Sequence, residues 1–443
     1  MIERIRASKY RGLLWIAIIG ILYLMTLLHI PMVVKNLFLV TSSSICLYML
    51  WKENSEIKWE VPVLILGLFA RVAFACLDVY AGFELPIGGG DDGITFMHTA
   101  IEYCQGDFHR QYTRYPYVLY AIFQITGINQ FAAQYANILC WGFGAVLLQK
   151  LCKRLKMNGV LRLLVILVAA WLPTNIWITS ILYRDTYVML LLLMSYYFLV
   201  CWMQERKYSS IAGSMVAVFL AVLLHGGSIV ALIPIAVTIL FYSYKDQSFV
   251  LNRKKIYTGI ALITGGIIAL FIPQVQQIII NKFSFLENGL IDGINAWLAM
   301  KYDYTADAGS NYLMHRYLSG YFDIIVMTVQ KIYYHMFSPV PHMWRDMIDA
   351  IAFFGSSAPI YLIAMVLWIG SIFYKAFDSN RFLLFMETSV TIVIYAWGNV
   401  NGGTAIRHRE KILGLMILLA VYSLNIILQK RKERKNCEKL SEN

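Results

Sequence analysis

The sequence predicts an all-α integral membrane protein, a bundle of about twelve transmembrane helices. Of its 443 residues, 59% are hydrophobic and only 14% are charged, which is more apolar surface than one water-soluble core can bury. Apolar stretches of roughly 20 residues recur from end to end, and a helix needs about that length to cross the hydrocarbon. Basic residues also gather in alternate connecting segments.

The predicted spans follow one another along the whole chain, so we expect a single membrane domain over residues 1–443. No separate water-soluble domain is expected. The predicted spans are 13–30, 33–51, 61–81, 131–149, 160–179, 186–203, 209–226, 228–243, 256–274, 358–375, 382–399 and 411–428.

Topology follows from the basic residues. With the N-terminus in the cytoplasm, 25 of the 38 lysines and arginines fall on short cytoplasmic segments, as the positive-inside rule requires. Both termini are then cytoplasmic, and residues 429–443 form a basic cytoplasmic tail. The net charge of +12 is explained by topology, so no nucleic-acid partner is expected.

Two long loops lie on the outer face in this topology, residues 82–130 and 275–357. Each contains an apolar segment that we interpret as a helix in the membrane interface. Residues 117–126 are too short to cross the membrane, and residues 321–337 carry three ionisable side chains. All eight histidines also fall on outer loops or outer span ends. The chemistry of the protein is therefore expected on its extracytoplasmic side.

The first outer loop contains the most informative motif. Three glycines, residues 88–90, precede Asp91 and Asp92, and a predicted helix follows. The positive end of a helix favours carboxylates, so the pair suits a general base. In the alternative interpretation, Asp91 caps the helix and Asp92 is a solvated neighbour.

The pattern of polar residues between the apolar spans resembles that of the GT-C glycosyltransferases. These are membrane enzymes of the protein mannosyltransferase and lipid A aminoarabinose transferase type. The resemblance covers roughly residues 60–240, with a weaker match before the last span. The residues that carry it are Arg71, Asp91-Asp92, Gly106, Tyr115-Pro116, Pro173, Ser180, Arg184-Asp185 and Arg407-His408-Arg409-Glu410. It implies a GT-C-like fold and an inverting transfer of a sugar from a polyprenyl-phosphate or polyprenyl-diphosphate carrier to a glycan or lipid acceptor.

Such a transfer needs a base for the acceptor hydroxyl and cations for the departing phosphate, and guanidinium suits phosphate best. Asp91 or Asp92 is the expected base. The expected phosphate ligands are Arg407 and Arg409, followed by Arg184 and Arg114. We expect the acid pair and the arginine run to meet at a lipid-accessible groove. Candidate substrate-binding residues are His98, Glu102, Asp185, His225 and His408.

Two alternatives stay open, a polymerase of O-antigen or capsule repeat units and a non-enzymatic transporter or flippase of lipid-linked glycans. A transporter is expected to show paired halves, and no internal repeat is seen. No cofactor is required, although Asp91 and Asp92 could bind Mg²⁺ or Mn²⁺. The chain also lacks an Asn-x-Ser/Thr glycosylation motif, which fits a bacterial plasma membrane.

Overall fold

The computed structural model describes residues 2–83, 92–109, 113–269, 289–306, 310–374 and 378–441. The described chain is helical apart from one short antiparallel hairpin of β1 and β2. In its first half the elements are α1 (Ile2–Leu27), α2 (Met32–Asn54), α3 (Glu60–Ala81), α4 (Asp92–Cys104), α5 (Tyr115–Thr126), α6 (Gln130–Arg154), α7 (Gly159–Trp171), α8 (Pro173–Ser180), α9 (Asp185–Glu205) and α10 (Tyr208–Leu224).

The second half begins with the 3-10 helix η1 and ends with a long helix that includes residues 429–441 of the basic tail. Its elements are η1 (Gly226–Ala231), α11 (Leu232–Phe241), β1 (Tyr242–Ser243), β2 (Ser248–Phe249), α12 (Arg253–Ala269), α14 (Leu290–Tyr304), α15 (Tyr321–Phe337), η3 (Pro341–Met343), α16 (Met347–Phe354), α17 (Ala358–Phe373), α18 (Ser379–Gly398), α19 (Gly402–Glu410) and α20 (Leu413–Ser441).

The predicted helical membrane architecture is confirmed at the level of its apolar helices. Five described helices are long and apolar enough to cross a membrane, namely α2, α3, α6, α9 and α20, and two bent pairs bring the number to seven. Within the described residues, each predicted span overlaps one helix or two consecutive ones; residues 270–274 of the ninth predicted span and residue 375 of the tenth lie outside the described residues. The two predicted interfacial segments are helices α5 and α15, the second with the expected bounds.

Two predicted spans are not continuous α-helices, and the one at 228–243 is divided between η1 and α11. The span predicted at 160–179 is divided into α7 and α8, which meet at an angle of 54°. Pro173 begins α8, and Leu172 before it has the extended backbone that a following proline favours. The break lies beside α3, against which both helices pack.

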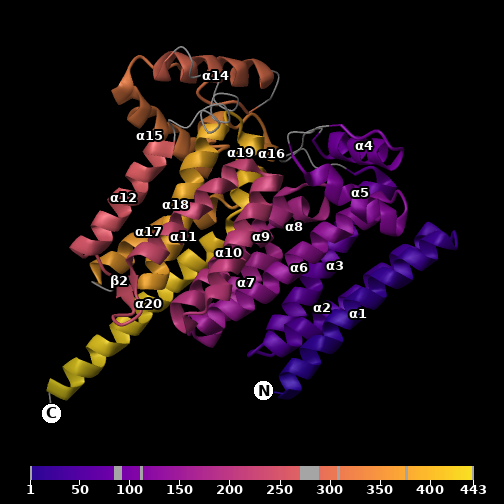
Figure 1. Ribbon diagram of the computed structural model, residues 1–443, viewed down its shortest axis with the longest axis horizontal. Coiled ribbons are helices and arrows are strands. Elements are labelled where there is room, and N and C mark those ends of the chain that lie inside the picture. The colour runs from indigo at the N-terminus through magenta and orange to yellow at the C-terminus, as the bar shows by residue number, and fades with distance from the viewer. Residues whose placement is uncertain are drawn as a thin grey trace.

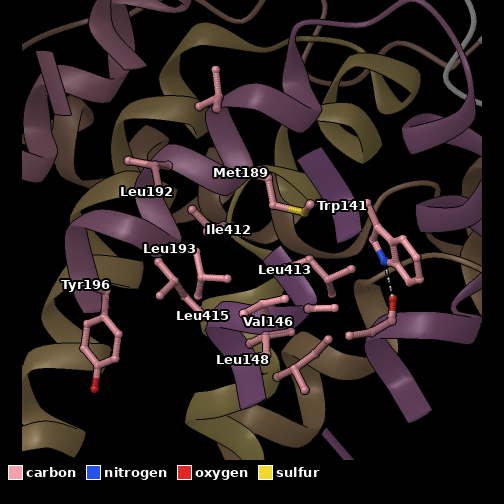
Figure 2. Packing of buried hydrophobic residues seen from close by; sticks show 14 of the residues in the cluster. Trp141, Val146, Leu148, Met189, Leu192, Leu193, Tyr196, Ile412, Leu413 and Leu415 are labelled. Carbon is pink, nitrogen blue, oxygen red and sulfur yellow. Dashed lines mark hydrogen bonds between the residues drawn. The ribbon is translucent and has the colours of Figure 1, made fainter. Parts of the chain in front are cut away.

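Helices α6, α9 and α20 form the centre of the apolar core. Figure 2 shows Trp141 and Leu148 of α6, Met189 and Leu193 of α9, and Leu413 of α20 gathered in one cluster. The indole N–H of Trp141 donates to the carbonyl oxygen of Ala169 in α7 at 3.1 Å, the dashed contact in that view. The core thus joins elements from both halves of the sequence.

Both termini lie at one end of the bundle, and a layer of shorter helices covers the other end (Figure 1). Helices α4, α14, α15, α16 and α19 lie in or beside that layer. Their residues come from the two loops that the sequence placed outside, together with the segment before α20. The elements that carry the candidate chemistry therefore share one end of the molecule.

Candidate functional site

The candidate site is built on α19, the short helix before α20. The helix is capped by Asn401, whose side chain accepts a hydrogen bond from the backbone N–H of Thr404 at 3.1 Å. Its last turn carries three basic residues in a row, and successive residues of an α-helix point about 100° apart. Arg407, His408 and Arg409 therefore face three different groups of neighbours.

Arg407 joins two carboxylates from distant parts of the sequence. Its Nη2 lies 2.9 Å from Oδ2 of Asp92, at the start of α4, and 3.3 Å from Oδ2 of Asp185, at the start of α9. Its guanidinium carbon lies 4.0 Å from the ring centroid of Tyr183. Burial acts to lower the pKa of Arg407, but the two carboxylates and Tyr183 raise it above its usual value. Arg407 is therefore firmly cationic, and the expected meeting of Asp92 and Arg407 is observed.

A second cation, Lys411, holds the other oxygen of Asp185. Its Nζ lies 2.9 Å from Oδ1 of Asp185, and the two side chains are 0% and 1% exposed. Lys411 was not among the residues that the sequence predicted for the site. It follows Arg407 by four positions, the spacing at which helical side chains share a face, and this spacing is the signal that could have identified it.

Asp92 is the more open of the two acids. Its side chain is 34% exposed, whereas that of Asp185 is 1% exposed. Helix α4 approaches closely because Gly93 has no side chain: a Cβ there would lie only 2.9 Å from the carbonyl oxygen of Leu182. This contact brings the first turn of α4 against the connection between α8 and α9. Asp185, the first residue of α9, follows directly after that connection.

Arg184 adds a third cation beside Asp185. Its guanidinium carbon lies 5.4 Å from the ring centroid of Phe96 on α4, and its charge acts on both Asp185 and Lys411. We call the five charged residues the Arg407 cluster; three are cations and two are carboxylates, so one positive charge is in excess. The cluster suits an anion such as phosphate. Its members are Asp92, Arg184, Asp185, Arg407 and Lys411.

Two histidines and a tyrosine form an aromatic wall next to the Arg407 cluster. The rings of His225 and His408 are 5.0 Å apart, and they lie 5.0 and 5.3 Å from the ring of Tyr395 on α18. The hydroxyl of Tyr395 lies 3.1 Å from Oγ of Ser228. Burial and the positive charge of Lys411 lower the pKa of His408, so its imidazole is neutral near pH 7.

Arg409 faces away from the Arg407 cluster. Its Nη1 donates to the carbonyl oxygen of His335 on α15 at 2.9 Å, and its Nη2 donates to Oγ of Ser356 at 3.2 Å. Two positions along a helix turn a side chain by about 200°, which explains why Arg407 and Arg409 do not form the expected common clamp. Arg409 instead connects α19 to α15 and to the turn before α17.

Three other candidates lie in the first loop, apart from the contacts of the Arg407 cluster. His98 is exposed on α4. Glu102 lies 3.7 Å from Nε2 of His109, and both side chains are at least 40% exposed. Arg114 is exposed, with its guanidinium carbon 5.5 Å from the ring of Tyr117. None of these contacts reaches the Arg407 cluster.

The predicted acid pair is described only in part. Asp91 lies outside the described residues, and Asp92 is held by Arg407. Among the residues that the structure describes, no group of three or more histidine, cysteine, aspartate or glutamate side chains is placed to hold a metal ion. The described part of the site contains cationic side chains in fixed positions, and these can bind an anion.

No protein-family model matches this chain, and no curated protein and no solved structure is similar to it. The resemblance to GT-C enzymes rests on the sequence motifs alone. What the protein does has to be argued from the Arg407 cluster.

Proposed function

We propose that this protein is a membrane glycosyltransferase that moves a sugar from a polyprenyl-phosphate-linked donor to a glycan or lipid acceptor on the extracytoplasmic face. The observation that carries the proposal is the contact of Arg407 with Asp92 and Asp185. An anion-binding cation and a partly exposed carboxylate lie in direct contact at one end of an apolar bundle. A transfer from a lipid phosphate needs both groups close together.

In the proposed reaction, the donor phosphate binds Arg407 with the help of Arg184 and replaces the contact that Asp92 makes. The released Asp92 carboxylate accepts the proton of the acceptor hydroxyl. The hydroxyl oxygen bonds to the anomeric carbon, and the bond from that carbon to the phosphate oxygen breaks. The electron pair stays on the phosphate, where the guanidinium groups stabilise the charge, and the sugar inverts its configuration.

Asp185 and Lys411 have a supporting role in this proposal. Both are enclosed, so they are poorly placed to touch a sugar. Their ion pair holds the start of α9 against the end of α19, which keeps Arg407 in position. His225, His408 and Tyr395 supply a neutral aromatic wall on which a sugar ring can pack.

The membrane placement belongs to the same proposal. We infer twelve spans, cytoplasmic termini and a site that opens on the extracytoplasmic side of a bacterial plasma membrane. Labelling tests the orientation: a cysteine at exposed Asp303 of α14, in a Cys-free background, is expected to react with an impermeant maleimide in intact cells. Protection until lysis would place the site on the cytoplasmic side.

The decisive experiment measures transfer from a radiolabelled polyprenyl-phosphate sugar by the purified protein in lipid nanodiscs, with a cell-envelope glycolipid as acceptor. Asp92→Asn and Arg407→Gln are expected to lose transfer. Asp303→Asn, which removes an exposed carboxylate from α14, is the matched control and keeps it. Full transfer by both site variants would overturn the assignment.

The same assay separates the other functions. A ladder of lengthening products on the lipid carrier identifies a repeat-unit polymerase. Movement of an unaltered lipid-linked glycan across the bilayer, with no transfer, identifies a flippase.

A further inference from the structure

A chain of buried polar groups lies directly behind the Arg407 cluster. It begins at Arg71 on α3, which the membrane topology places inside a span and which is fully enclosed. All five N–H groups of its guanidinium have an acceptor in hydrogen-bond range. The acceptors are Oγ1 of Thr179 at 2.8 Å, the carbonyl oxygens of Gly67 at 3.0 Å, Ala170 at 2.8 Å and Ala169 at 3.4 Å, and Oδ1 of Asn175 at 2.8 Å.

Arg71 donates hydrogen bonds to the carbonyl groups left unpaired at the helix break between α7 and α8. The last carbonyl groups of a helix have no partner within that helix, and in a membrane they must find one. Ala169 and Ala170 belong to the last turn of α7, and Thr179 and Asn175 belong to α8. Gly67 allows this close approach, because a Cβ there would lie 3.2 Å from that of Ala170.

Asn175 connects Arg71 to Glu410, because its side chain accepts a hydrogen bond from Arg71 and donates one to Glu410. A guanidinium only donates, so the Asn175 side chain must turn its oxygen toward Arg71 and its NH₂ group away. That NH₂ group donates to Oε2 of Glu410 at 3.0 Å, and Oγ1 of Thr174 donates to Oε1 of Glu410 at 2.9 Å. Each of these hydrogen bonds therefore has a fixed donor and a fixed acceptor.

Glu410 is the last residue of α19, between Arg409 and Lys411. Its two carboxylate oxygens are held by the first turn of α8, so the C-terminal turn of α19 is fixed to the helix break. Arg407 lies one turn before Glu410 on the same short helix. A shift of α19 would therefore move the guanidinium of Arg407 away from Asp92.

We propose that Arg71, Asn175 and Glu410 are positioning residues that hold α19 so that Arg407 meets Asp92. The inference rests on the proposed function in one respect only, namely that Arg407 is the phosphate ligand. These three residues touch no substrate. A simpler alternative is that the chain only satisfies buried polar groups and contributes to stability without controlling Arg407.

A double-mutant cycle distinguishes the two interpretations without any substrate. The midpoint of thermal unfolding in detergent is measured for Asp92→Asn, for Arg407→Gln and for both together. In the native background the two shifts are expected to be non-additive, because the side chains are 2.9 Å apart. In a Glu410→Gln background they are expected to become additive, since the contact between Asp92 and Arg407 is lost.

The rescue variant is set by the directions of the hydrogen bonds. Glu410→Gln alone leaves one acceptor oxygen for two donors: if that oxygen faces Thr174, the new NH₂ meets the NH₂ of Asn175, and if it faces Asn175, the Thr174 hydroxyl must accept where it donated before. Adding Asn175→Asp restores every pairing: the new carboxylate accepts from Arg71 and from the new amide, whose oxygen still accepts from Thr174. The double variant is expected to recover the non-additivity between Asp92 and Arg407.

A second background keeps the test decisive if Glu410→Gln does not fold. Thr174→Val removes one of the two bonds to Glu410 and is expected to reduce the non-additivity. Glu60→Gln, which breaks the buried Glu60–Arg162 pair elsewhere in the chain, is the control that lowers stability and leaves the non-additivity intact.

Two results would overturn the inference. One is unchanged non-additivity between Asp92 and Arg407 in the Glu410→Gln and Thr174→Val backgrounds. The other is failure of the Asn175→Asp/Glu410→Gln variant to recover it. Neither readout depends on sugar transfer, so a failed glycosyltransferase assay leaves this result to be judged on its own.

Discussion

Nη2 of Arg407 and Oδ2 of Asp185 lie 3.3 Å apart, although 222 positions separate the two residues in the sequence. This contact joins the start of α9 to the end of α19, and Asp92 completes it from α4. Three segments that are far apart in the sequence form one charged group at the end of an apolar bundle.

Removing the guanidinium of Arg407 tests the proposed phosphate site. Arg407→Gln is expected to reduce kcat for sugar transfer about 100-fold or more, because a preorganised donor to the developing charge is lost. Arg407→Lys keeps the charge but cannot contact two oxygens in a planar arrangement, so it is expected to recover only part of the rate. Steady-state transfer kinetics with a polyprenyl-phosphate sugar measure both.

The matched control is Arg345→Gln on the loop before α16. Arg345 is 58% exposed and pairs with Asp349, a residue outside the Arg407 cluster, so transfer is expected to stay at the native rate. An equal loss in Arg345→Gln and Arg407→Gln would show that the assay responds to net charge and not to the site.

Asp185 is predicted to be a strong determinant of stability. Asp185→Asn leaves the enclosed Lys411 without its carboxylate partner and leaves Arg407 with Asp92 alone, which is expected to cost about 3–5 kcal/mol of unfolding free energy. Adding Lys411→Met removes the amine that lost its partner, so the double variant is expected to be more stable than Asp185→Asn alone. Denaturant unfolding in mixed micelles measures the difference; a double variant that is less stable would contradict the pairing.

The predictable part of the structure is the part set by local hydropathy. A span needs a continuous apolar stretch, and the described part of each predicted span therefore overlaps described helices. The division at Pro173 was not predicted, because the residues on both sides of it are apolar enough to be one span. The carbonyl groups exposed by that break are satisfied by Arg71, a contact between residues about one hundred positions apart.

The candidate site was predictable only as three separate motifs. Asp92 and Arg407 were identified because an acid at a helix start and an arginine on an outer face need an explanation, and Arg184-Asp185 was identified through the family resemblance. The sequence grouped Arg407 with Arg409 by proximity, but the helical turn separates them. Lys411 was missed because it was included in the apolar span that follows, where its burial against Asp185 has no local signal.

A second buried ion pair, elsewhere in the chain, is predicted to matter for stability alone. Arg162 on α7 contacts Glu60 of α3, with 1% and 0% of the side chains exposed. Arg162→Met strands Glu60 and is expected to cost about 3–5 kcal/mol of unfolding free energy. Arg154→Met removes the more open pair with Glu205 and is expected to cost at most about 1 kcal/mol.

Unfolding in detergent measures both variants, and transfer kinetics at a temperature where each is folded should match the native protein. If Arg162→Met and Arg154→Met lose the same stability, burial of the Glu60 pair is not what makes it important.

Lys331 on α15 gives the protein a predictable dependence on alkaline pH. Its side chain is fully enclosed, and its Nζ donates to the carbonyl oxygen of Asn399 at 3.2 Å. Burial, with a smaller contribution from the charge of Lys301, lowers the pKa of Lys331 to about 8. The unfolded chain keeps this proton up to roughly pH 10.4, so between these values the unfolded state binds more protons.

The contribution of Lys331 to the unfolding free energy must therefore rise as the pH increases from about 8 to about 10.4. The unfolding free energy of the native protein relative to Lys331→Met is expected to increase by on the order of 3 kcal/mol across that window. Lys207→Met is the control: Lys207 is 66% exposed, so its removal is expected to leave the pH profile parallel to that of the native protein. Denaturant unfolding at several pH values measures both differences. A difference for Lys331→Met that stays flat or falls with pH would mean that the enclosed amine keeps its proton, and would require an anionic partner for it.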